Sequence, residues 1–206
     1  MLNLSELQHD ALVEIFNIGV GQAARAMSEI VNEEVTMSVP SISFLNRADA
    51  AAMLGNKDGN RVCGVSQHYG GAFQTEAILM FPEDKSLDIV RLMVGESVPL
   101  KELTEMEQEA LSEIGNIILN ACVGTLANIF AQELSGSLPE YRIGTSGEIL
   151  QASGGQADTV VLMLHIDFIL EKHQIHGYVA FILDLSALQD LQGQVDKYLA
   201  NVTGGA

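Results

Sequence analysis

The sequence predicts an α/β (α+β) fold in which two pseudo-symmetric repeats share one mainly antiparallel sheet, with two long helices packed on it. Three observations predict this fold. The order of helices and strands expected in the first half recurs in the second half. The segment 11–18 is identical to the segment 110–117 at six of eight positions, and Pro40 and Pro139 keep the same spacing of 99 residues. We therefore expect a single domain over 1–206, with internal repeats at about 5–98 and 104–202.

The first half begins with a long helix, which we expect over 6–31. Ser5 and Gln8 form a capping box that satisfies the free amides of its first turn. In the strand that follows, the apolar residues change phase at Pro40, which predicts a bulge or an edge position. The remaining elements expected in this half are the strand itself over 34–46, a short helix over 48–54, a hairpin of strands 61–69 and 73–81 that turns at Gly70-Gly71, and a helix over 85–94.

The second half repeats this order. Thr104 and Glu107 form a second capping box, which predicts a long helix from Thr104 to about Leu134. The elements expected after it are a strand over 138–143, a loop or weak helix over 144–156, a hairpin of strands 159–170 and 175–185, a last helix over 186–202 and a frayed tail over 203–206.

Composition excludes several classes of protein. Hydrophobic residues make up 48% of the 206 residues, which is typical of a globular chain. The formal net charge of −17 would repel a phosphate backbone, so no nucleic acid partner is expected. No uninterrupted apolar run approaches the roughly 18 residues of a spanning helix and the start lacks a signal-peptide pattern, so we expect a cytoplasmic protein without membrane insertion. Cys63 and Cys122 lie among apolar residues and form neither a disulfide framework nor a zinc motif.

One face of each long helix carries similar polar residues at the same spacing. In each helix they occupy positions i, i+4 and i+7, within about 60° of arc. They are Asp10, Glu14 and Asn17 in the first helix, and Glu109, Glu113 and Asn116 in the second. An ordinary solvated face is the simpler explanation for one such helix. However, Glu and Asn recur together while neighbours such as Phe16 and Gly115 diverge, and Asn disfavours a helix interior. The recurrence therefore favours a functional site.

The chemistry open to a Glu–Asn pair on an exposed helix is limited. An Asn amide can orient a water molecule but cannot take its proton. An ionised Glu can pair with a Lys or Arg of a partner, and no Ser, Cys or Lys stands beside the pair as a nucleophile. Such a helix is suited to insertion into the active site of another protein. Phosphoryl-group hydrolysis fits this arrangement, because positioning accounts for most of its catalysis.

The spacing of these residues resembles the signature of the CheC/CheX/FliY family of chemotaxis phosphatases: Asp or Ser, three residues, Glu, two residues, Asn, twenty-two residues, Pro. The resemblance extends over nearly the whole chain, and its two motif copies without a further switch domain are most similar to CheC. One copy matches fully and the other departs at its first position, where Glu replaces Asp or Ser. The two copies are Asp10, Glu14, Asn17 and Pro40, and Glu109, Glu113, Asn116 and Pro139.

The resemblance implies an enzyme that hydrolyses the aspartyl phosphate of a CheY-type response regulator. Glu14 and Glu113 would each pair with the active-site lysine of the regulator. Asn17 and Asn116 would align the attacking water. The regulator would supply Mg²⁺, so the chain would need no cofactor or metal of its own. The departure at Glu109 implies only a modest loss.

Two further implications concern structure and partners. Pro40 and Pro139 would shape the strand after each helix rather than take part in catalysis. CheC proteins often bind the deamidase CheD through the region that corresponds here to 144–156. That region is glycine-rich and lacks a convincing apolar helix, so CheD binding is an open hypothesis.

Other functions compete with the phosphatase. A non-catalytic module or adaptor for a phosphorylated receiver or for CheD would use the same helix faces. Gly19 to Ala24 matches a dinucleotide fingerprint, but without the preceding strand it favours close helix packing. The four residues that suggest a metal site near the second hairpin are His165, Asp167, His173 and His176. Their register is uncertain and exposed hairpin histidines are common, so no metal site is expected.

Overall fold

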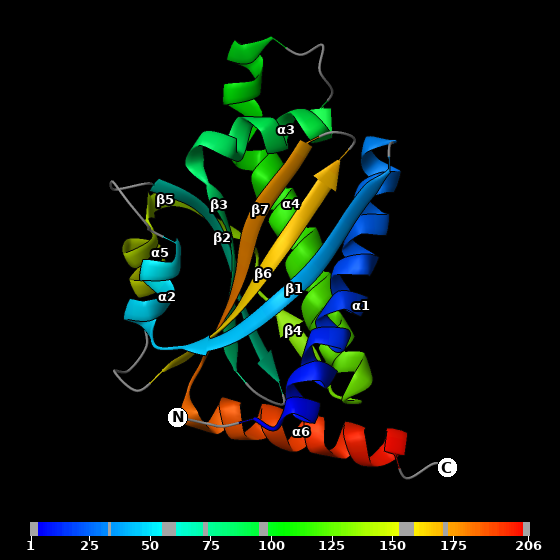
Figure 1. Cartoon of the computed structure of the whole chain (residues 1–206). Coiled ribbons are helices and arrows are strands. Elements are labelled where there is room, and N and C mark those ends of the chain that lie inside the picture. The colour runs from blue at the N-terminus through cyan, green and yellow to red at the C-terminus, as the bar shows by residue number, and fades with distance from the viewer. Residues whose placement is uncertain are drawn as a thin grey trace.

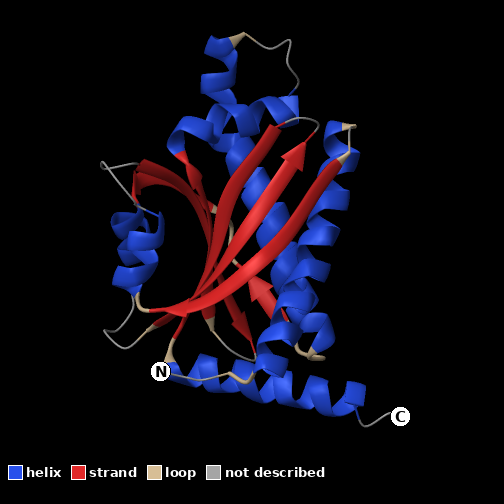
Figure 2. Ribbon diagram, in the orientation of Figure 1, coloured by secondary structure: helices blue, strands red, loops and turns tan. Residues whose placement is uncertain are grey.

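The computed structural model describes residues 4–32, 34–54, 61–71, 74–94, 99–152, 159–170 and 173–203 (Figures 1 and 2). The helices are α1 (Glu6–Val31), α2 (Arg47–Leu54), η1 (Glu83–Lys85, a 3-10 turn), α3 (Ser86–Val94), α4 (Leu100–Ile129), α5 (Ser146–Ala152) and α6 (Leu185–Thr203). The strands are β1 (Val35–Leu45), β2 (Arg61–Gly71), β3 (Thr75–Pro82), β4 (Leu134–Gly136), β5 (Glu140–Thr145), β6 (Val160–Leu170) and β7 (His173–Leu183).

The strands form one antiparallel sheet to which both halves of the chain contribute, as the sequence predicts. Its order is β1-β6-β7-β3-β2-β4, with β5 paired to β2. The two halves exchange strands, since β1 pairs with β6 and β5 pairs with β2. The register follows the repeat: Ser41 lies opposite His165, and Glu140, 99 residues after Ser41, lies opposite Ser66, 99 residues before His165. The halves are therefore interleaved, with β3 and β7 paired at the centre.

Helices cover the sheet on both faces. The long helices α1 and α4 lie side by side on one face, α2 and α5 lie on the other, and α6 crosses one end (Figures 1 and 2). Successive side chains along a strand point to opposite faces of the sheet, so the same strands contribute residues to both hydrophobic cores. In β6, Leu164 and Ile166 face the long helices, whereas Val161 and Met163 pack toward α2 and α5. The two long helices thus carry their polar faces outward from the larger of the two cores.

The first half is predicted well. Helix α1 has the expected bounds and its capping box, in which the Gln8 amide donates to Ser5 Oγ (3.2 Å) and the Ser5 amide donates to Gln8 Oε1 (2.8 Å). Strand β1 lies at an edge of the described sheet, and its register shifts between Ser38 and Ser41, around Pro40. The missing amide of Pro40 is the physical reason for the irregularity at this point.

Helix α4 differs from its prediction at both ends. It begins at Leu100, after Pro99, so Thr104 lies inside the helix and the predicted Thr104–Glu107 cap is wrong. The residues between Pro99 and Thr104 are good helix formers, which explains the extra turn. The helix ends at Ile129 rather than near Leu134, because the chain turns at Ala131 with a φ of +51°.

Residues beyond that turn form a strand that the sequence analysis missed. Strand β4 pairs with the end of β2, where Gly70 lies opposite Ser135 and Gly71 opposite Leu134. This pairing keeps Gly70-Gly71 in β2, so the predicted turn at these glycines is wrong, and β3 begins at Thr75.

Segment 144–156 contains a defined helix, α5. Thr145 and Glu148 form a capping box: the Thr145 amide donates to Glu148 Oε2 (2.8 Å) and the Glu148 amide donates to Thr145 Oγ1 (3.2 Å). Ile149 and Leu150 are buried in the core beneath α2 and α5. The expectation that this region lacks an apolar helix was therefore wrong, although its apolar side chains face inward. Of the predicted tail, Thr203 ends α6, and 204–206 lie outside the described residues.

One segment, Thr104–Ile129 of α4, is long and apolar enough to cross a membrane by length and composition alone. Polar residues interrupt the segment, so it contains no long uninterrupted apolar run. Within its most apolar stretch, 56% is buried inside the protein. That burial, against α1 and the sheet, accounts for the apolar composition of the segment.

Candidate functional site

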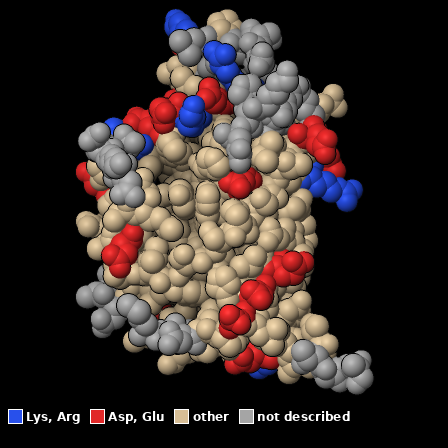
Figure 3. Space-filling view, viewed as in Figure 1, with Lys and Arg blue, Asp and Glu red and all other residues tan. Residues whose placement is uncertain are grey.

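The acidic residues of the first motif lie in solvent on α1. Figure 3 shows a diagonal row of acidic side chains over the N-terminal part of this helix, where the exposed acidic residues are Glu6, Asp10 and Glu14. Among the described residues, the one polar partner of the Asp10 carboxylate is the imidazole of His9, at 3.7 Å. Glu14 has no hydrogen bond or ion pair with any described residue. This row is therefore available to a cationic partner.

Asn17 is positioned differently from its two acidic companions. Its side chain is half-buried and joins α1 to the backbone of β1. The Val39 amide donates to Asn17 Oδ1 (2.9 Å), and Asn17 Nδ2 donates to the carbonyls of Val13 (3.0 Å) and Val39 (3.4 Å). The expectation of a fully exposed stripe was therefore wrong at Asn17. The Asn–Pro spacing has a structural reason, because it brings the residue before Pro40 opposite this amide.

A second side chain of the same helix face binds the same strand. The Val35 amide donates to Ser28 Oγ at 2.9 Å. The small residue Ser28 thereby fixes the start of β1. Gly21, which lies between Asn17 and Ser28 on this face, is exposed with open space around it.

The second motif holds its Asn in another way. Asn116 Oδ1 accepts hydrogen bonds from Gln67 Nε2 (3.1 Å) and Asn120 Nδ2 (2.7 Å). Gln67 Nε2 also donates to the carbonyl of Ser137 (2.8 Å), which fixes the orientation of the Gln67 amide and hence of Asn116. Asn116 Nδ2 has no partner in the described part of the chain, so its two hydrogens can bind an incoming group.

Hydrogen bonds connect the polar side chains of Asn116, Gln67, Asn120 and Tyr69. The Tyr69 hydroxyl lies 3.0 Å from Gln67 Oε1 and 3.0 Å from Asn120 Oδ1, and burial raises the pKa of this phenol. Sequence reasoning missed Gln67 and Tyr69, since a single polar residue in a strand carries no pattern. Asn120, in place of the repeat-related Gly21, was the one available signal.

The difference between the two motifs originates one residue before each Asn. A Cβ on Gly115 would lie 2.4 Å from Val65 Cγ1, so this glycine lets α4 approach β2 closely. The corresponding Phe16 is fully buried and packs on Phe181, with ring centroids 5.4 Å apart. The close approach of α4 brings Asn116 within reach of Gln67 on β2.

The surroundings of the second motif are exposed. Glu109 and Glu113 lie in solvent on α4 and, among the described residues, have no ion pair. Leu138, just before the half-buried Pro139, is 86% exposed and follows the Ser137 that binds Gln67. An exposed apolar side chain beside the segment that binds Gln67, together with unpaired carboxylates on α4, is suited to contact with another protein.

The structure also locates the glycine of the dinucleotide-like segment and the two cysteines. Gly19 lies within α1, where an added Cβ would be 3.0 Å from Cys122 Cα, so this glycine serves helix packing as expected. Cys63 and Cys122 are buried and unpaired, and burial raises the pKa of both thiols to about 12.

Three of the four residues weighed as metal ligands come together in the described structure. His165, Asp167 and His176 lie close together on the sheet face opposite the long helices, whereas the side chain of His173 lies outside the described part of the structure.

Comparison with known proteins gives three findings. The CheC-like family matches residues 7–44, which include the whole first motif. The CheY-P phosphatase CheC of Bacillus subtilis (strain 168) is 27% identical over 150 residues, 71% of this chain and 71% of that protein. The crystal structure of Thermotoga maritima FliY superimposes with a TM-score of 0.77 at 17% identity, covering 96% of this chain and 100% of that chain.

A complex is also similar in fold. The CheX-CheY-BeF3-Mg²⁺ crystal structure from Borrelia burgdorferi matches with a TM-score of 0.52 at 19% identity, covering 84% of this chain and 97% of that chain. The duplicated motif, the sequence similarity and the interleaved antiparallel sheet all indicate the same group of related proteins. The chain is similar in sequence and in fold to members of the CheC/CheX/FliY family.

Proposed function

We propose that the protein is a cytoplasmic chemotaxis phosphatase that hydrolyses the aspartyl phosphate of a CheY-type response regulator. The observation that carries the proposal is the second motif, where an exposed carboxylate and an amide with a free NH₂ group project from one helix face. The similarity to a protein named CheY-P phosphatase supports this substrate class.

In the proposed reaction, Glu113 pairs with a lysine of the regulator and sets the docking position. Asn116 hydrogen-bonds the attacking water and holds it in line with the phosphorus. The water oxygen bonds to phosphorus as the bond to the aspartyl oxygen breaks. The products are a free aspartate and inorganic phosphate, and the proton lost by water passes to the phosphate or to solvent. The Mg²⁺ that neutralises charge in such reactions would belong to the regulator, so the chain would need no cofactor of its own.

We propose that the two motifs differ in how freely their Asn amide can bind the attacking water. The Asn116 amide is held by its oxygen and presents its nitrogen freely. The Asn17 amide uses both its oxygen and its nitrogen on the backbone of α1 and β1. Catalysis by Asn17 would require at least one of these bonds to open, at a cost of about 1 kcal/mol. We infer that the second motif contributes most of the activity.

Release of phosphate from a phosphorylated CheY-type receiver tests the proposal. Four proteins are compared: wild type, Asn17→Ala, Asn116→Ala and the double variant. We expect Asn116→Ala to lower the rate by about tenfold, the loss of one hydrogen bond of about 1.4 kcal/mol in the transition state. Asn128→Ala is the matched control, because Asn128 is exposed on the same helix away from the motif.

The alternative is a non-catalytic adaptor. An adaptor would bind the phosphorylated receiver and leave its rate of phosphate loss unchanged, in wild type as in all variants. Binding without acceleration, measured in the same samples, would replace the phosphatase with the adaptor. A fall in activity with Asn128→Ala equal to that with Asn116→Ala would remove the role assigned to the motif.

A further inference from the structure

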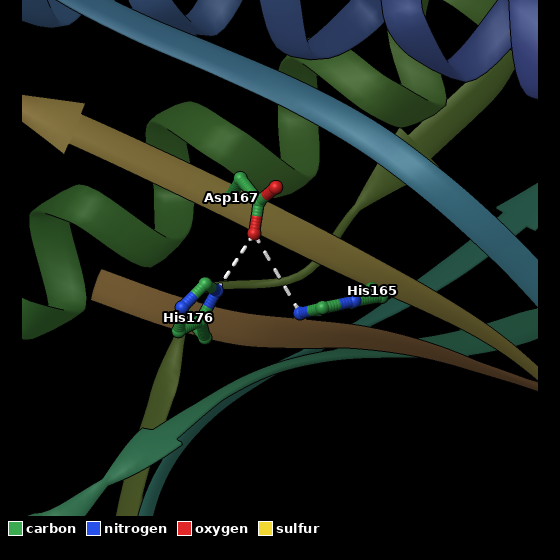
Figure 4. Close-up of side chains that lie close together, drawn as sticks. All are labelled: His165, Asp167 and His176. Atoms are coloured by element: carbon green, nitrogen blue, oxygen red, sulfur yellow. Dashed lines mark hydrogen bonds and ion pairs between the residues drawn. The ribbon is translucent and has the colours of Figure 1, made fainter. Parts of the chain in front are cut away.

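Three potential metal ligands meet on the sheet face opposite the long helices. His165 and Asp167 are two residues apart on β6 and therefore point to the same face, and Asp167 lies directly opposite His176 on β7. Figure 4 shows the carboxylate of Asp167 between the two imidazoles. His176 Nδ1 lies 2.7 Å and His165 Nε2 3.7 Å from Asp167 Oδ1. All three ligand atoms lie within 4.8 Å of one another.

The arrangement is partly preorganised. The His165 ring stacks on Tyr178, with centroids 5.1 Å apart and an interplanar angle of 18°. His165 Nε2 is buried, directed toward Asp167 and without a hydrogen-bond partner among the described residues. A buried polar atom without a hydrogen-bond partner destabilises the folded state, and a ligand at this position would supply the missing partner. His176 is exposed, so solutes reach the group from solvent.

We propose that His165, Asp167 and His176 form a binding site for a divalent transition-metal ion such as Zn²⁺. Two imidazole nitrogens and one carboxylate oxygen are a donor set that suits zinc and its neighbours in the first transition row. Small side-chain rotations that break the Asp167–His176 hydrogen bond would open a position for the ion between the three ligand atoms. Remaining coordination positions would hold water, and the net charge of −17 favours cation binding.

The first half of the chain provides an internal comparison. The same cross-strand position there holds His68 opposite Glu76, with His68 Nδ1 4.0 Å from Glu76 Oε2. Ser66 occupies the position that corresponds to His165. The first half thus has a His–carboxylate pair but no second imidazole, so a comparable three-ligand site exists only in the second half of the described structure.

Titration of the full chain with Zn²⁺ alone, followed by calorimetry, tests the site. We expect one equivalent to bind wild type, and His165→Gln or Asp167→Asn to weaken binding by about tenfold or more. His68→Gln is the matched control and should bind as wild type does. The absorption spectrum of the Co²⁺ complex is an independent measurement. Two imidazoles and a carboxylate produce visible d–d bands, whereas binding by the cysteines would add thiolate absorption in the near ultraviolet.

Clear outcomes overturn the proposal. They are absence of Zn²⁺ binding to folded wild type, equal binding by wild type and Asp167→Asn, or thiolate absorption in the Co²⁺ complex. Asp167→Asn keeps the shape of the side chain, and circular dichroism identifies any variant that fails to fold. The readout is binding, so it is independent of phosphatase activity.

Discussion

Val39 and Asn17 are joined by hydrogen bonds in both directions: the Val39 amide donates to Asn17 Oδ1 (2.9 Å) and the Asn17 amide donates to the Val39 carbonyl (3.4 Å). This pair fixes the edge strand β1 to the middle of α1, just before the bulge at Pro40. A residue of the proposed catalytic motif therefore also holds the fold together. Among the described residues, the repeat-related Asn116 has no such bond to the backbone of a strand.

The first prediction follows from this difference. Asn17→Ala should lower the free energy of unfolding by about 1–3 kcal/mol, because the backbone amide and carbonyl of the buried Val39 lose their partner. Asn116→Ala removes bonds to side chains that can rearrange, and should cost less than Asn17→Ala. Urea denaturation of both variants measures this order, and the opposite order would contradict the structural role of Asn17.

The second prediction concerns Gln67 as a positioning residue. In the Asn17→Ala background, Gln67→Leu should lower kcat for phosphate release by about fivefold, since Asn116 loses a hydrogen bond worth about 1 kcal/mol that holds its oxygen. KM should change little, because Glu113 still docks the regulator. His68→Gln, next to Gln67 but on the opposite face of β2, is the control. A rise in KM at constant kcat would show a docking role instead.

The third prediction compares two glycines of α4. Gly115→Ala would place a Cβ 2.4 Å from Val65 Cγ1 and should destabilise the protein by about 1–3 kcal/mol. Gly124→Ala meets nothing within 4 Å and should stabilise the same helix by about 0.5–1 kcal/mol. Thermal unfolding distinguishes the two.

The role of Val65 provides a second check. Val65→Ala combined with Gly115→Ala should recover part of the loss, because the clash involves the methyl groups of Val65. Equal effects of the two glycine variants would show that α4 is not closely packed on β2 at this point.

The features predictable from the sequence are those that a local pattern or the internal repeat specifies. The bounds of α1 follow from the Ser5–Gln8 capping box, and the irregularity in β1 follows from Pro40. The shared sheet follows from the repeat, because two halves with the same order of helices and strands must bury the same apolar faces of those elements. The exchange of β1 and β5 between the halves needs long-range pairing, which no local pattern specifies.

The sequence proposes residues for the candidate site but does not specify their environment. Both Glu–Asn pairs stand out through the internal repeat, yet the bond from Asn17 to Val39 depends on how α1 lies over β1. Gln67 was missed because its partner Asn116 is 49 residues away in the sequence. By contrast, Thr145 and Glu148 did form a recognisable capping box, which was overlooked within a glycine-rich segment.

The last prediction uses that capping box and its dependence on pH. The amide and hydroxyl of Thr145 donate to the Glu148 carboxylate and lower its pKa. A carboxyl with a lower pKa in the folded state stabilises the protein above its unfolded pKa, and this stabilisation disappears as the pH falls through the folded value. Wild type should therefore be more stable than Glu148→Gln at pH 7, and the difference should shrink toward pH 3. Denaturation of both proteins at the two pH values measures it, with Glu102→Gln on the exposed first turn of α4 as the control. A difference between wild type and Glu148→Gln that stays constant with pH would show that the charge of Glu148 does not support the start of α5.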